Sequence, residues 1–141
     1  MALRVLVVND DAFELATLSA ALRLHTINVV GEAKNLAVAE SLFRSLQPEV
    51  LVIDIQFDGQ EAISLAKKLR KLNPALGIVL TTACPDLRLL GIANKDIPTG
   101  SQLIVRCQPQ RLWLLLVKLL LSMYHLRPVP IYVDHLRLLQ R

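Results

Sequence analysis

The sequence has little of what marks several classes of protein. It holds two cysteines, Cys84 and Cys107, in 141 residues. Two thiols this far apart fit neither a disulfide framework nor a Cys-x-x-Cys metal site, so we expect reduced thiols in a cytoplasmic protein. The three histidines, His25, His125 and His135, fit no metal-binding spacing.

Long uninterrupted hydrophobic runs are also missing. The apolar run at the N-terminus ends at Asn9, which makes it too short for the core of a signal peptide, so we expect no secretion. The most apolar stretch, residues 112–124, is interrupted by Lys118 and Ser122. It falls short of the roughly 20 residues that a membrane-spanning helix needs, and we therefore expect a soluble protein without a membrane partner.

The positive charge is confined to one part of the chain. Residues 98–141 carry six Lys and Arg against one acid, whereas residues 1–97 carry ten against eleven, and the net charge is +4. Six dispersed cations form no cluster, so a solvated surface explains them better than a nucleic-acid site does.

Short apolar runs alternate with stretches of helical period, which favours βαβ units and a parallel sheet. Val, Ile and Leu dominate the runs, as expected for strands covered on both faces. The length suits one domain, residues 1–125, followed by a linker or tail, residues 126–141, that begins near Pro128 and Pro130. The expected strands are residues 3–8, 27–31, 50–54, 78–82 and 103–106.

Apolar residues at helical spacing predict helices between the strands. Asp10 or Asp11 is expected to cap the first and Asn35 the second, while Pro48 and Pro74 follow the second and third as stop signals. A weak fourth helix is expected at 87–93 and a fifth at 110–125. The core stripes of the first three are Leu15, Leu18 and Leu22; Ala39, Leu42 and Leu46; and Ala62, Leu65, Ala66, Leu69 and Leu72.

The expected fifth helix is apolar around nearly its whole circumference, more than one face of a sheet covers. The excess surface is buried either by the tail of the same chain or by a partner helix in a dimer, and the sequence leaves both open.

Acidic residues follow two of the expected strands. Asn9, Asp10 and Asp11 come after the first, and Asp54 ends the third. The carboxyl ends of parallel strands form the crevice where ligands bind, so neighbouring strands would bring these acids together. Such a place suits a divalent cation beside a carboxylate nucleophile.

The order of these parts resembles the receiver domain of two-component response regulators, which has the flavodoxin-like (CheY-like) α/β fold. The resemblance covers residues 3 to about 125 and rests on Asn9-Asp10, Asp54, Thr81 and Arg106 at the ends of the first, third, fourth and fifth strands. Two further segments, 29–33 and 46–50, look closest to the NarL/FixJ class. The resemblance implies a doubly wound sheet of five parallel strands in the order 2-1-3-4-5, with five helices.

The resemblance also implies a function. Asp54 would accept a phosphoryl group from a histidine kinase, and Mg²⁺ would be held by Asp10, Asp54 and the main-chain carbonyl of Gln56. Thr81 and Arg106 would contact the phosphoryl oxygens. The phosphorylated domain would switch a homodimer, formed through the fifth helix, or an output domain, as in transcription control by a DNA-binding domain that this chain does not show.

Several positions depart from the family pattern. Asn9 stands where an acid is common, which weakens the expected Mg²⁺ site, and Arg106 replaces a lysine. Asp58-Gly59 follows Asp54 sooner than usual, which shortens the loop. Leu103 takes the place of an aromatic residue and Thr82 that of a small one.

These departures leave alternatives open. Asp10 and Asp11 also suit plain helix caps, and Arg106 also suits an ion pair with Asp54. The chain is then either a working phosphoacceptor or a degenerate receiver that acts as an interaction or dimerisation module without phosphate. We do not expect an enzyme, because a phosphatase with Asp54 as nucleophile would need a general acid two residues on, where Gln56 stands.

Overall fold

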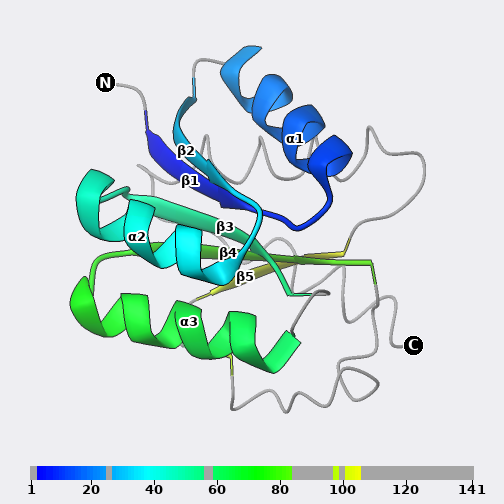
Figure 1. Ribbon diagram of the computed structural model, residues 1–141. Coiled ribbons are helices and arrows are strands. Elements are labelled where there is room, and N and C mark those ends of the chain that lie inside the picture. Colours follow the sequence, from blue (N-terminus) through cyan, green and yellow to red (C-terminus); the bar gives the residue numbers. More distant parts are fainter. Residues whose placement is uncertain (1–2, 25–26, 56–58, 84–96, 99–100, 106–141) are drawn as a thin grey trace.

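The structure, a computed structural model, describes residues 3–24, 27–55, 59–83, 97–98 and 101–105 (Figure 1). Among these residues no helix is both long and apolar enough to cross a lipid bilayer. The described elements are β1 (Arg4–Val8), α1 (Ala12–Leu24), β2 (Asn28–Ala33), α2 (Leu36–Leu46), β3 (Val50–Asp54), α3 (Gly59–Leu72), β4 (Gly77–Thr82) and β5 (Gln102–Val105).

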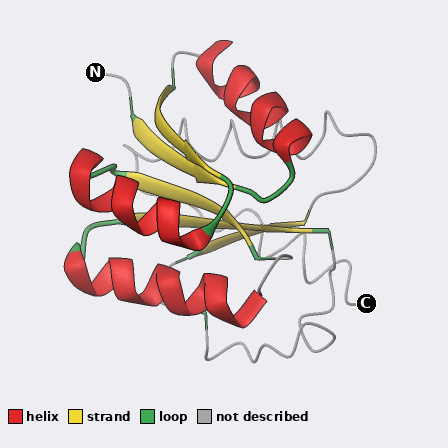
Figure 2. Ribbon diagram, in the orientation of Figure 1, coloured by secondary structure: helices red, strands yellow, loops and turns green. Residues whose placement is uncertain are grey.

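The strands form one parallel sheet in the order β2-β1-β3-β4-β5. Helix α1 covers one face, while α2 and α3 lie side by side on the other (Figures 1 and 2). The expected doubly wound, flavodoxin-like arrangement is thus confirmed. The expected helices at 87–93 and 110–125 and the tail 126–141 lie outside the described residues.

Side chains alternate between two hydrophobic cores along each strand, because successive residues of a strand point to opposite faces. On the α1 face, Val5, Val7, Val50, Val52 and Val79 pack against Leu15, Leu18 and Leu22. On the other face, Leu6, Val8, Leu51, Ile53, Ile78 and Leu80 pack with residues of α2 and α3, which include Ala39, Phe43, Ala66 and Leu69. Most residues of the predicted helix stripes therefore lie in the core, but Leu72, at the end of α3, is 51% exposed and does not.

Strand β2 extends beyond its predicted end at residue 31. Glu32 and Ala33 continue the pairing with β1, after a register shift between Val5 and Leu6 of that strand. A Cβ atom at Gly31 would lie 3.0 Å from a methyl carbon of Leu46, so a side chain there would press on α2. Glycine at this position therefore permits the close approach of helix and strand rather than ending the strand.

The ends of α2 follow the predicted signals. Asn35 is its N-cap, and the side-chain oxygen accepts a hydrogen bond of 2.8 Å from the Val38 N–H. The helix ends at Leu46, and Gln47 adopts the left-handed conformation with φ of 47° and ψ of 65°. Arg4 of β1 donates hydrogen bonds to the carbonyl oxygens of Leu46 and Gln47, which the helix itself leaves without partners.

Candidate functional site

Three polar residues lie next to one another where β1, β3 and β4 end. Val8 pairs with Ile53, so Asn9 and Asp54 follow at the same level, and Asp54 pairs with Thr81. Alternation places all three side chains on the α1 face, two residues beyond Val7, Val52 and Val79 respectively. The fold therefore brings together three of the predicted site residues from positions distant in sequence.

All three residues are buried, although they are polar. Asn9 is 2% exposed, Asp54 3% and Thr81 2%. A buried carboxylate is costly and rarely occurs without a partner, and such groups concentrate at functional sites. The burial of Asp54 therefore makes it a candidate functional carboxylate.

The two aspartates that follow β1 have different roles. Asp11 caps α1, because its Oδ1 accepts hydrogen bonds from the N–H groups of Phe13 at 2.9 Å and Glu14 at 3.0 Å. Asp10 precedes the cap and is exposed. The alternative interpretation as a helix cap therefore applies to Asp11 alone.

The Asn9 amide makes two hydrogen bonds with the start of α1. Its Oδ1 accepts from the Asp11 N–H at 2.9 Å, and its Nδ2 donates to Oε2 of Glu14 at 3.1 Å. The backbone N–H of Asn9 also donates to the Ala33 carbonyl at 3.0 Å, which extends the β1–β2 pairing. The side chain therefore joins the end of β1 to the first turn of α1.

Glu14 was not among the predicted site residues. The spacing Asp11-x-x-Glu14 is that of a capping box, in which the glutamate bonds back to the N–H of the cap residue. Here Asn9 accepts from that N–H, and Glu14 accepts from Asn9 instead. The capping-box spacing in the sequence could have indicated that Glu14 bonds near the start of α1. Only the structure shows that its partner is the Asn9 amide.

The structure describes only some of the other predicted site residues. Gln56, the shortened loop with Asp58, and Arg106 lie outside the described residues. Thr82, next to Thr81, is 0% exposed and lies on the α2/α3 face by alternation. The predicted strand 103–106 appears as β5, Gln102–Val105, where Ile104 pairs with Thr81.

The donor atoms at this sheet edge are compatible with Mg²⁺. Asp10 and Asp54 offer carboxylate oxygens, and Mg²⁺ in proteins commonly uses one or two carboxylates and keeps several waters. Asn9 is a poorer candidate ligand, because its oxygen already accepts from Asp11. In the described part of the chain no three His, Cys, Asp or Glu side chains cluster.

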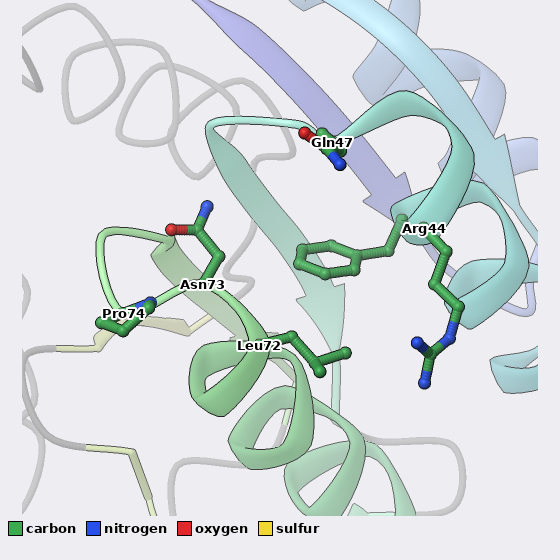
Figure 3. Close-up of a pocket in the computed structure, with 6 residues that line it drawn as sticks. Arg44, Gln47, Leu72, Asn73 and Pro74 are labelled. Atoms are coloured by element: carbon green, nitrogen blue, oxygen red, sulfur yellow. The ribbon is translucent and has the colours of Figure 1, made fainter.

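A concave region lies at the opposite edge of the sheet, where α2 and α3 end (Figure 3). It has a volume of about 490 Å³, and Arg44, Gln47, Leu72, Asn73 and Pro74 line it with Phe43. These residues precede β3 and β4, so this cleft is separate from the carboxyl ends that carry Asp54. It has no part in the candidate site.

Comparison with known proteins gives consistent matches. The family model described as the response regulator receiver domain matches residues 5–93. CheY of Thermotoga maritima is 30% identical over 83 residues, which cover 59% of this chain and 69% of CheY. A protein-glutamate methylesterase/protein-glutamine glutaminase of Caulobacter vibrioides is 35% identical over 81 residues, which cover 57% of this chain but only 24% of that protein.

A solved structure has the same fold. The signal receiver domain of the response regulator NarL from Mycobacterium tuberculosis superposes with a TM-score of 0.67 at 23% identity, covering 86% of this chain and 97% of that one. The family match extends over more than half of the chain and includes Asn9, Asp10, Asp54 and Thr81. The chain therefore belongs to the response regulator receiver domain family, whose members act in phosphorelay signal transduction.

Proposed function

We propose that this domain accepts a phosphoryl group from a histidine kinase on Asp54. The observation that carries the proposal is a buried carboxylate, 3% exposed, at the carboxyl end of the central strand β3, in register with Thr81. One carboxylate oxygen attacks the phosphorus of a phosphohistidine. The new O–P bond forms as the P–N bond breaks, and the bonding electron pair stays on the imidazole nitrogen.

Neighbouring groups would assist the transfer. Mg²⁺, when bound, neutralises charge on the phosphoryl group, and the residues that would hold it are Asp10, Asp54 and the carbonyl of Gln56. The Thr81 hydroxyl would donate a hydrogen bond to a phosphoryl oxygen, and Arg106 would pair with another. The neutral amide at Asn9 removes one negative charge, so we expect the Mg²⁺ affinity to be low.

The product would act as a switch rather than as a step in the turnover of a small molecule. An acyl phosphate on Asp54 would shift a two-state equilibrium of the domain by stabilising one state. A homodimer through the expected helix 110–125, control of a DNA-binding output domain and a cytoplasmic location all stay predictions.

Phosphorylation by a small donor tests the proposal directly. The protein is incubated with acetyl phosphate and Mg²⁺, and its intact mass is measured over time. We expect one phosphate in the wild type and none in Asp54→Asn, which preserves size but removes the nucleophile. If Asp54→Asn gains the same phosphate as the wild type, the assignment of the nucleophile is wrong.

The two adjacent threonines provide a matched comparison for the hydroxyl. Thr81→Val and Thr82→Val each remove one buried hydroxyl from β4 and preserve the shape of the side chain. Because Thr81 shares the face of Asp54, Thr81→Val should slow phosphorylation and Thr82→Val should leave its rate near that of the wild type. The reverse result would assign the phosphoryl contact to Thr82.

A second function is supported by the Asn9 amide. Its bonds to Asp11 and Glu14 hold the loop around Asp10 through side chains of the protein itself. This is consistent with a degenerate receiver that acts as an interaction module without phosphate. Absence of any mass change at high Mg²⁺, in a protein that remains folded, would favour this second function.

A further inference from the structure

The loop from β1 to α1 is held by a continuous set of hydrogen bonds. Asn9 closes an Asx turn around Asp10, because its Oδ1 accepts from the Asp11 N–H at 2.9 Å. The Asp11 side chain caps α1 through Phe13 and Glu14, and the Leu15 N–H donates to the Asp11 carbonyl at 2.9 Å. Hydrogen bonds therefore fix the backbone on both sides of Asp10.

The Asn9–Glu14 bond needs an amide at position 9. Asn9 is 2% exposed and Glu14 is half-buried, so water screens this pair only in part. An aspartate at position 9 would still accept from the Asp11 N–H. It would have no hydrogen to donate to Glu14, and two carboxylates would face each other at hydrogen-bonding distance, which is repulsive unless a cation lies between or beside them.

We propose that Asn9, paired with Glu14, is a positioning residue that presents Asp10 in its site without a divalent cation. The loop is then preformed in the metal-free protein. The negative charge that an acid would place at position 9 lies instead on Glu14, in the first turn of α1. The inference rests on the proposed function only in taking Asp10 as a ligand for Mg²⁺, since the loop geometry is independent of phosphorylation.

The pair can be inverted without a change of net charge. In Asn9→Asp/Glu14→Gln, the glutamine amide donates to the aspartate, so donor and acceptor exchange places. Asn9→Asp alone creates the repulsive pair, and Glu14→Gln alone retains an acceptor for Asn9. Asn73→Asp is the matched control, because Asn73 Oδ1 also closes an Asx turn, to the Ala75 N–H at 3.1 Å, at the opposite edge of the sheet.

The experiment measures melting temperature by circular dichroism, in EDTA and in excess Mg²⁺, for the wild type and these four variants. In EDTA we expect Asn9→Asp to melt about 3 °C lower, a shift typical of one lost interaction in a domain of this size. The inverted pair and Asn73→Asp should melt within about 1 °C of the wild type. Mg²⁺ should raise the melting temperature of Asn9→Asp more than that of the wild type.

Calorimetric titration with Mg²⁺ gives a readout that a merely structural role would not change. The inverted pair moves a negative charge to position 9, beside Asp54, and should bind Mg²⁺ several-fold more tightly than the wild type at equal stability. The proposal is overturned if Asn9→Asp is as stable as the wild type in EDTA, or if the inverted pair is no more stable than Asn9→Asp. Failure of Asp54 to accept phosphate leaves both measurements unaffected, so the two proposals fail separately.

Discussion

Glycine in place of Gln47, the left-handed residue that follows α2, should stabilise the protein. Gln47 has φ of 47°, a region that costs a residue with a Cβ atom roughly 1–2 kcal/mol, and it precedes Pro48. Its side chain is exposed, whereas its backbone does the capping: the N–H donates to the Phe43 carbonyl at 2.9 Å and the carbonyl accepts from Arg4 at 2.8 Å. Gln47→Gly retains both bonds and removes the strain.

Glycine also has more conformational freedom than glutamine in the unfolded state, and this reduces the stabilisation by about 0.4–1 kcal/mol. The net stabilisation should be about 0.5–1 kcal/mol, or about 2–3 °C in melting temperature for a domain of this size. Urea denaturation and thermal melting measure it, with Gln47→Ala as the control that removes the side chain but leaves the Cβ atom. The reasoning is refuted if Gln47→Gly is no more stable than Gln47→Ala.

Three further predictions concern the described helices. The hydrogen bond from Lys68 lowers the pKa of Glu40 from its ordinary value. The stability difference between wild type and Lys68→Ala should therefore be present at neutral pH and vanish as Glu40 is protonated in acid; a difference that persists at low pH would contradict this. Ser19→Ala should raise the free energy of unfolding in urea by about 1 kcal/mol, because in the described structure the buried Ser19 hydroxyl has no hydrogen-bond partner. A lower free energy of unfolding in Ser19→Ala would contradict this and indicate that the hydroxyl has a partner. Asn35→Ala should cost about 1 kcal/mol by the same assay and Asn35→Gly only a few tenths, and equal losses would argue against the N-cap role.

The fold was largely predictable because each strand carries its own signal. Runs such as 50–54 and 78–82 are apolar and β-branched, and leucine and alanine recur at helical spacing between them. Strand ends were less predictable. The strand predicted at residues 27–31 continues to Ala33 through its pairing with β1, and that pairing depends on a partner distant in sequence.

The candidate site was predictable in part. Asp54 was singled out as an acid at the end of a strand and Thr81 through the resemblance to receiver domains, and the two residues pair in the sheet. The difference between Asp10 and Asp11 did not follow, because both suit a helix cap and only backbone geometry selects Asp11. The roles of Gln56 and Arg106 stay predictions, since both lie outside the described residues.

The sequence by itself determined the type and order of the elements, because hydrophobic period and cap residues act within a few positions of the chain. It also determined that acids end the first and third strands. Only the tertiary structure decided that Asn9, Asp54 and Thr81 are buried side by side on the α1 face. The physical reason is that burial and hydrogen-bond pairing depend on strand order and register, which join residues far apart in the chain, such as Asp54 and Thr81.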